Sequence, residues 1–270
     1  MDDIKFGIQE AIADYNTRQK EIPNTLWKQG NENLKNQKYS EAINDFSKLI
    51  QIDPKNIDVY LARGYSYYQN NMLSNSISDL NTYIASVTDN SFAFSTRGWV
   101  KYYQKDYFGA MMDFNKQVEL EPNSAIAYYN RGSAKSKLND EIGAISDYTK
   151  SIENKPDFSM AYNNRGWSKF NQKNYTGALL DLNKAIELDN KNWIAFDSRQ
   201  ETKFSLNDIV GCIEDCNQAI LLNPASANSY LFRGRAKLKQ GNKQNGCEDL
   251  SRAGELGKSE AYEYISKYCQ

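Results

Sequence analysis

The chain has 270 residues, of which 40% are hydrophobic and 13% aromatic, and this content excludes wholesale disorder. Its formal net charge of -1 lacks the basic excess of a nucleic-acid-binding protein, so no nucleic-acid partner is expected. Histidine, the commonest general base and metal ligand, is absent. No apolar stretch approaches the roughly 18 residues that a membrane-spanning helix needs, so no membrane insertion is expected.

The first segment, residues 1–22, is predicted to be a capping helix. Apolar side chains follow helical spacing at Ile4, Ile8, Ile12 and Tyr15. Residues 11–15 also echo residues 144–148, so the segment resembles a lone second helix that covers the open face of the first repeat. It has no continuous hydrophobic run and is therefore not a signal peptide, although an exported protein expressed without its leader would look the same.

Residues 23–260 repeat with a fixed period of 34 residues. The dipeptide Arg-Gly recurs at positions 7 and 8 of the repeat in five copies. Its arginine is Arg63, Arg97, Arg131, Arg165 or Arg233. Gln29-Gly30 and Arg199-Gln200 fill the same place in the other two. The frame has no insertion or deletion, and its seven copies start at residues 23, 57, 91, 125, 159, 193 and 227.

Three further positions of the frame predict a helical hairpin in each copy. Position 20 is small throughout, as at Ala144; position 24 is apolar, as at Leu182; and position 32 is proline in four copies, as at Pro122. Glycine at position 8 and a small residue at position 20 let two helices approach closely, while the residue at position 24 fills the space beside them. Proline ends the second helix. Each hairpin must stack on its neighbours to bury its apolar face.

These positions resemble the tetratricopeptide-repeat family, in its bacterial type with Arg-Gly in the first helix. The pattern is carried by Asn164-Arg165-Gly166, Tyr175, Ala178, Asp181-Leu182 and the run from Ala185 to Asp189. The resemblance covers residues 23 to about 260. It implies an all-α, right-handed superhelical solenoid of seven helix-turn-helix repeats, in which the first helix of each repeat lines the concave face.

The last segment, residues 261–270, is predicted to be a C-terminal capping helix, because it imitates a first helix without a partner. An alternative is that both terminal helices are exposed dimerisation helices. We expect a monomer rather than a homodimer.

Two positions depart from the family pattern, which has an apolar residue at 7 and an aromatic at 23. Position 7 is arginine in six copies, namely the five above and Arg199, and position 23 is aspartate in all seven: Asp45, Asp79, Asp113, Asp147, Asp181, Asp215 and Asp249. A pattern repeated along a rod favours structural ion pairs over catalysis. Because Asp45 would meet the uncharged Gln29 within its own copy, we predict that each aspartate pairs with the arginine of the following repeat. The series would run from Asp45–Arg63 to Asp249–Lys267.

The four cysteines, Cys212, Cys216, Cys247 and Cys269, lie in the last quarter of the chain. Their uneven spacing is not typical of a disulfide framework and favours a reducing compartment, so a cytoplasmic location is expected. Cys212 and Cys216 occupy positions 20 and 24, which predicts buried, unbonded core thiols rather than metal ligands.

The resemblance places positions 2, 5, 6, 9, 12 and 13 of each first helix on the concave face. The candidate peptide-binding residues there are Asn130, Asn164, Asn163, Trp99, Trp167, Tyr65, Tyr129 and Tyr102. Asn130 and Asn164 share position 6 of adjacent repeats and resemble the short asparagine ladder with which some family members hold an extended peptide. Trp99 and Trp167 would be partly exposed apolar anchors. The alternative is that these aromatics only pack on neighbouring helices.

The expected function is a non-catalytic scaffold that binds an extended peptide or partner segment in the concave groove. No three consecutive repeats carry the Lys and Asn pattern of the family's carboxylate clamp for chaperone tails, which disfavours that partner class. No phosphate loop, nucleophile–base pair or metal cluster occurs, so we expect no enzyme activity, catalytic residue, metal or cofactor. The alternatives are a structural module that self-assembles through its capping helices and an adaptor within a larger complex.

Overall fold

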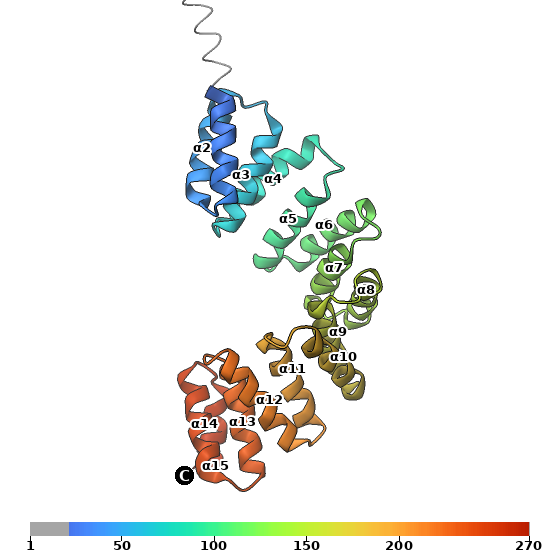
Figure 1. Cartoon of the computed structure of the whole chain (residues 1–270), viewed down its shortest axis with the longest axis vertical. Helices are drawn as coiled ribbons and strands as arrows, with labels where there is room; N and C mark the ends of the chain where they lie inside the picture. The colour runs from blue at the N-terminus through green and yellow to red at the C-terminus, as the bar shows by residue number, and fades with distance from the viewer. Residues whose placement is uncertain (1–21, 270) are drawn as a thin grey trace, which may run out of the picture. The chain divides into compact units, whose positions relative to one another are not determined.

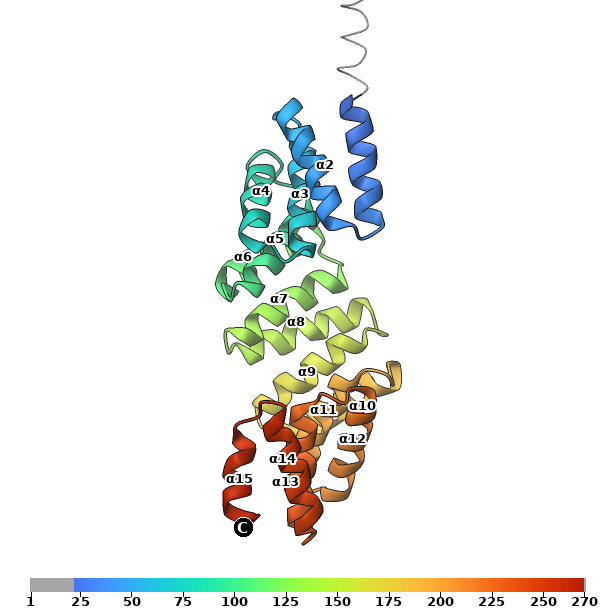
Figure 2. The same ribbon diagram turned by 90° about the vertical axis from the view of Figure 1, so that its left-hand side faces the viewer.

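The computed structural model describes residues 22–269, which form α-helices joined by turns, with no strand in that range. The predicted helix over residues 4–20 lies outside the described residues. The chain divides into two compact units, Met1–Pro122 and Asn123–Gln270. In both, consecutive helices pair in chain order (Figure 1, Figure 2). The predicted all-α repeat solenoid is confirmed, and between residues 22 and 269 no helix combines the length and apolarity needed to cross a bilayer.

Within its described residues, 22–122, the first unit contains three helical hairpins. Their first helices are residues 22–35, α3 (Ile57–Gln69) and α5 (Ser91–Tyr103). Their second helices are α2 (Tyr39–Ile52), α4 (Leu73–Ser86) and α6 (Tyr107–Leu120). Helices α3 and α5 begin at the first residue of their repeats in the 34-residue frame.

The second unit contains four hairpins and one more helix. Its first helices are α7 (Ala125–Lys137), α9 (Ser159–Asn171), α11 (Trp193–Ser205) and α13 (Ala227–Lys239). Its second helices are α8 (Glu141–Asn154), α10 (Tyr175–Leu188), α12 (Ile209–Leu222) and α14 (Lys243–Glu255). Helix α15 (Glu260–Tyr268) packs on α13 and α14.

The turn inside each hairpin uses the same backbone conformation. One turn residue is left-handed, with φ of 58–65° at Gln37, Asn71, Lys105, Asn139, Lys173 and Asn207 and 80° at Gly241. The first helix ends two residues before this left-handed residue, and the residue that follows it often caps the second helix. For example, the Asp140 carboxylate accepts from the backbone N–H of Gly143 at 2.9 Å. Only the last copy places glycine, which adopts this conformation freely, at the left-handed position.

The two helices of a hairpin approach most closely at the position-8 glycine. A Cβ added to Gly98 would lie 2.5 Å from Cε1 of Phe114, and one added to Gly166 would lie 2.9 Å from Cγ of Leu182. Phe114 and Leu182 are fully buried. The predicted role of glycine at position 8 opposite a large residue at position 24 is therefore confirmed.

The sixth repeat reverses these two sizes. Gln200 occupies the glycine position and is fully buried, while position 24 is the smaller Cys216, which is also fully buried. Nε2 of Gln200 donates to Oδ1 of Asp197 at 2.8 Å. The small thiol leaves the room that the longer amide side chain occupies.

Within each unit, the first helices lie closer to one another than the second helices do. Successive first helices pack against each other, as in α3–α5 and α9–α11, whereas the backbones of successive second helices in the described chain stay more than 8 Å apart. The first helices therefore line the inner side of each unit's curvature. We refer to their exposed side chains, at positions 2, 5, 6, 9, 12 and 13, as the first-helix face.

The predicted pairing of aspartate with the following repeat is wrong, because six of the seven aspartates pair with the arginine of their own repeat. Arg165 donates through Nε and Nη2 to the two carboxylate oxygens of Asp181, at 2.9 and 2.7 Å. The same bidentate pair joins Arg63–Asp79, Arg97–Asp113, Arg131–Asp147, Arg199–Asp215 and Arg233–Asp249. The two residues are 16 apart and face each other across one hairpin.

Asp45, whose own copy has Gln29, needs no cation, because it accepts a hydrogen bond from Nδ2 of Asn33 at 2.9 Å. At the other end of the series, Asp249 binds Arg233 and Lys237, and the ammonium of Lys267 lies over the ring of Tyr268 instead. The predicted pairing assumed that Asp45 needs a cation from the next repeat. It was wrong because the side-chain amide of Asn33 satisfies the Asp45 carboxylate instead.

The arginines still connect neighbouring repeats, through their third nitrogen. Nη1 of Arg199 donates to Asn183 Oδ1 at 2.8 Å, and Nη1 of Arg165 donates to Thr149 Oγ1 at 3.1 Å. The acceptor is a neutral side chain at position 25 of the preceding repeat. The guanidiniums of Arg63, Arg97, Arg165, Arg199 and Arg233 thus hold their own hairpins by charge and the previous hairpins by a neutral hydrogen bond.

Candidate binding face

In the first unit, the first-helix face is a cluster of aromatic rings on α3 and α5. The ring centroids of Tyr65 and Phe92 lie 5.2 Å apart, and those of Tyr68 and Tyr103 lie 6.2 Å apart. Phe92 is 51% exposed and Tyr103 is 58% exposed. Half-exposed rings in contact with one another form an apolar surface of the kind that protein partners cover.

Trp99 and Tyr102 extend this cluster along α5. Trp99 is partly exposed and packs edge-on against Tyr102 at 5.1 Å and against the buried Phe114 at 5.5 Å. Burial, followed by the neighbouring Tyr103, raises the pKa of Tyr68 to about 12, so this hydroxyl stays protonated at neutral pH. The cluster therefore combines an apolar surface with the uncharged hydroxyl group of Tyr68.

In the second unit, the candidate amides lie on α7 and α9. Nδ2 of Asn163 donates to Oδ1 of Asn164 at 3.1 Å, and Nδ2 of Asn164 donates to the Tyr129 hydroxyl at 3.2 Å. Asn164 is partly exposed, Asn163 is 7% exposed and Asn130 is 2% exposed. In this conformation Asn164 is the amide that the face presents to solvent.

Trp167, one helical turn beyond Asn163, is partly exposed and stacks on Phe170 at 5.1 Å with an interplanar angle of 15°. Phe170 in turn contacts Tyr175 at 5.4 Å. Both expected tryptophan anchors thus keep part of their rings in solvent.

A polar network continues the face onto α11 and α13. The carboxylate of Asp197 accepts hydrogen bonds from Ser229 Oγ at 2.7 Å and Asn228 Nδ2 at 3.0 Å. The same amide of Asn228 donates to Glu201 at 2.8 Å, and its oxygen accepts from the Lys258 ammonium at 2.9 Å. The network joins the last two repeats to the turn that precedes α15.

Burial raises the pKa of Glu201 above its ordinary value, and the nearby Asp197 adds to this. The hydrogen bond from Asn228 and the charges of Lys258 and Arg235 act in the opposite direction. Because the pKa is higher in the folded than in the unfolded chain, ionised Glu201 destabilises the fold. Its contribution to stability is most favourable below the unfolded pKa and is lost as pH rises through the folded pKa.

We therefore expect Glu201→Gln, which keeps an acceptor for Asn228, to raise the unfolding temperature at pH 7. At about pH 4, near the unfolded pKa of glutamate, the gain should shrink. Thermal unfolding by circular dichroism at the two pH values measures this. A loss of stability at pH 7, or a gain of equal size at both, would contradict the assignment.

Cys212 and Cys216 are free, fully buried thiols, as their positions in the frame predict. Their sulfur atoms lie 4.0 Å apart, and burial raises the pKa of Cys216, so the thiol stays protonated. No group of three or more potential metal-binding side chains occurs within residues 22–269.

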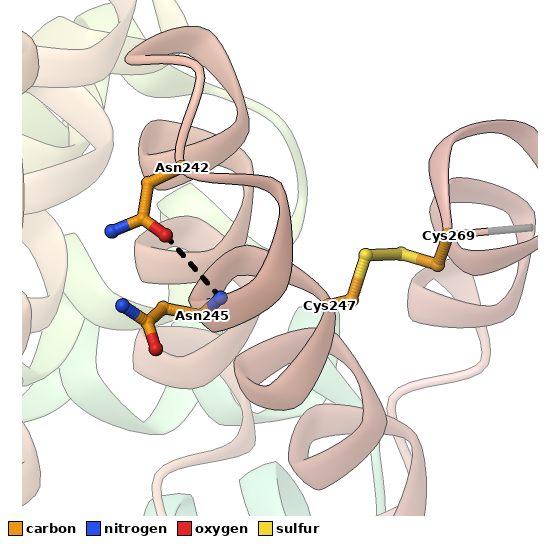
Figure 3. The surroundings of a disulfide bond; sticks show 4 residues. All are labelled: Asn242, Asn245, Cys247 and Cys269. Carbon is orange, nitrogen blue, oxygen red and sulfur yellow. Dashed lines mark hydrogen bonds between the residues drawn. A yellow bond between two sulfur atoms is a disulfide. The ribbon is translucent and has the colours of Figure 1, made fainter.

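The expectation that the cysteines form no disulfide is wrong for the other two. Cys247 on α14 is bonded to Cys269, the residue that follows α15 (Figure 3). Near the same bond, Asn242 caps the start of α14 by accepting from the backbone N–H of Asn245. The disulfide ties the end of the last helix to the last hairpin, where Ala261 is buried and Ile265 packs against the core.

Cys269→Ser should loosen α15 and cost about 2–3 kcal/mol, because the bond closes a loop with a sequence separation of 22. Hydrogen exchange should show faster exchange in α15 and unchanged exchange in α9. Alkylation of the unfolded, unreduced chain should block Cys212 and Cys216 alone. Four alkylated cysteines without a reductant would contradict the bond.

The helical hairpins define a repeat solenoid. The family model for TPR repeat matches residues 30–71, and that for tetratricopeptide repeat matches residues 125–158 and 161–192. The chain is a tetratricopeptide-repeat protein. Proteins of this family are generally non-catalytic scaffolds for protein–protein interaction.

Solved structures show the same fold at low sequence identity. A tetratricopeptide repeat protein from Parabacteroides merdae has a TM-score of 0.75 and 18% identity, over 93% of this chain and all of the other. PilW, a type IV pilus biogenesis factor, has a TM-score of 0.69 and 16% identity, over 78% of this chain and 98% of its own. YrrB, a TPR protein with an unusual peptide-binding site, has a TM-score of 0.55 and 15% identity, over 70% of this chain and 97% of its own. Curated protein sequences gave no match.

Proposed function

We propose that the chain is a non-catalytic scaffold that binds an extended peptide or partner segment along its first-helix face. The observation that carries this proposal is the cluster of half-exposed aromatic rings on α3 and α5. Phe92 and Tyr103 each leave about half of their surface in solvent while contacting other rings. Exposed aromatic clusters are costly in water and typical of binding hot spots.

The amides of the second unit suit the same role. Asn164 is held by Asn163 and Tyr129 and remains partly exposed, so it can exchange hydrogen bonds with the backbone of an extended ligand. Trp167 on the same helix supplies apolar contact area nearby. YrrB, described as a TPR protein with an unusual peptide-binding site, shares the fold and supports peptide binding as the kind of function proposed.

A second candidate is a self-assembling or adaptor module that uses its second helices. It is favoured by exposed apolar side chains at position 18 of the repeat frame, which lies on the second helix. There, Phe108, Ile142 and Val210 are 62%, 75% and 62% exposed. A partner or a second copy that covers these residues would bind the opposite side of the hairpins.

The disulfide indicates which kind of compartment the protein occupies. A bond between Cys247 and Cys269 supports an oxidising compartment, and so favours an exported protein over a cytoplasmic one.

Site-specific photo-crosslinking tests the proposal. A benzophenone amino acid is placed at Trp167 on α9 or, as the matched control, at Leu180, which is 71% exposed on α10. After irradiation in cell extract, the Trp167 variant is expected to yield a discrete crosslinked partner that the Leu180 variant does not. If only the Leu180 variant is crosslinked to a partner, that partner binds the second helices and the proposal is wrong.

A further inference from the structure

A pocket of about 620 Å³ lies at the end of the second unit, where α11, α13 and α15 meet. Its rings are Phe204 from α11 and Tyr264 and Tyr268 from α15, and α13 contributes Arg235, Leu238 and Lys239. Phe204, Arg235 and Lys239 hold positions 12, 9 and 13 of their repeats and so belong to the first-helix face. The disulfide-tethered helix α15 forms the remaining wall.

Arg235 is clamped between aromatic rings. Its guanidinium carbon lies 4.7 Å from the ring centroid of Phe204, 4.9 Å from that of Phe232 and 4.8 Å from that of Tyr264. Rings on several sides fix the plane of the guanidinium and reduce the entropy lost when it binds an anion.

The hydrogen-bonding capacity of Arg235 is incompletely used. Its buried Nε has no partner among the described residues, and Nη1 makes one long contact of 3.3 Å to a carboxylate oxygen of Glu260. Glu260 is 46% exposed, so it is weakly held. This contact shows that a carboxylate can reach the clamped guanidinium from the solvent side.

The charges that line the pocket are all positive. Lys239 lies with its ammonium 4.5 Å from the Phe204 centroid, and Lys243 lines the pocket beside it, while no acidic residue does. A cationic, ring-lined pocket matches a ligand that carries an anionic group next to an apolar one.

We infer that this pocket binds an acidic segment of a partner protein in which an aromatic side chain lies between carboxylate side chains. Because Arg235 fills the space between Phe204 and Tyr264, the aromatic residue enters the pocket beside Leu238 and Tyr268. The flanking carboxylates meet Arg235 and Lys239. The inference rests on the proposed function, because it assigns a ligand class to one end of the same first-helix face. Continuity of the pocket with that face favours a peptide over a free small anion.

The test measures binding of the unlabelled peptide acetyl-Gly-Glu-Phe-Glu-Gly-amide to the whole oxidised chain by isothermal titration calorimetry. The peptide with both glutamates replaced by glutamine should bind about tenfold more weakly. The peptide with phenylalanine replaced by alanine should lose a similar factor. A glutamine peptide that binds equally well would overturn the charge assignment.

Two pairs of substitutions locate the site on the protein. Lys239→Gln with Lys243→Gln removes two pocket charges on exposed side chains, and Lys150→Gln with Lys184→Gln removes two from α8 and α10, where both side chains are partly or mostly solvated. The first pair should weaken the acidic peptide about tenfold and the second by less than about twofold. Equal weakening by both pairs, or none by the first, would reject the pocket. If a crosslinked partner at Trp167 persists in that case, the proposed function survives and this inference alone fails.

Discussion

Replacing Arg63 with alanine is expected to destabilise the first unit by about 3–5 kcal/mol. The guanidinium of Arg63 binds both oxygens of Asp79, whose side chain is only 7% exposed. Position 11 of this repeat is Tyr67, so Asp79 has no second cation within ion-pair distance in the described structure. Removing Arg63 leaves a buried carboxylate without a counter-charge, which costs more than the pair itself contributes.

Arg97→Ala in the same unit is the matched control. The ammonium of Lys101 also binds Asp113, at 2.8 Å, and would remain after the substitution. The expected loss is therefore smaller, about 2 kcal/mol. Urea denaturation followed by circular dichroism compares the two variants. A loss for Arg63→Ala of less than about 1 kcal/mol, or one below that of Arg97→Ala, would show that the carboxylate is not dependent on its arginine.

Phe114→Ala should cost about 3–5 kcal/mol, because a fully buried ring is deleted from the contact between α5 and α6. The ring lies against Gly98, where an added Cβ would be 2.5 Å from Cε1. Gly98→Ala alone should therefore destabilise the hairpin through overpacking, by about 1–3 kcal/mol.

The double variant separates close packing from a general loss of helix stability. With Phe114 truncated, the methyl group of Gly98→Ala enters the cavity, so the second substitution should be neutral or stabilising. Additive losses in the denaturation of the two single variants and the double variant would show that the glycine does not serve the close approach.

The sequence predicted the repeat architecture in detail because every packing position recurs at 34 residues. The close approach at Gly98 and Gly166 follows from side-chain size alone, and the structure has it. The pairing of Arg165 with Asp181 could not be obtained from the same pattern, because pairing within or between repeats uses the same residues. Lysine at position 11 in five repeats was an unused signal: Lys169 is 12 residues before Asp181 and binds it too.

The first-helix face was only partly predictable. Which of Asn130 and Asn164 is exposed depends on how neighbouring helices cover them, and no single-residue property encodes this. Arg235 stands at position 9, which the resemblance places on this face, yet the rings around it come from three helices, one of them the C-terminal helix. The bond between Cys247 and Cys269 likewise depends on the docking of α15, which lies outside the repeat frame.

Partner binding on the first-helix face is tested most directly by comparing two exposed phenylalanines of the same hairpin. Phe92 is 51% exposed on α5 and Phe108 is 62% exposed on α6, so both can become serine with little effect on packing. With the crosslinked partner purified, isothermal titration calorimetry gives its affinity for each variant. If the partner binds the first-helix face, Phe92→Ser weakens binding by about tenfold or more while Phe108→Ser leaves it within about twofold. Weakening by Phe108→Ser alone would contradict binding on this face and place the partner on the second helices.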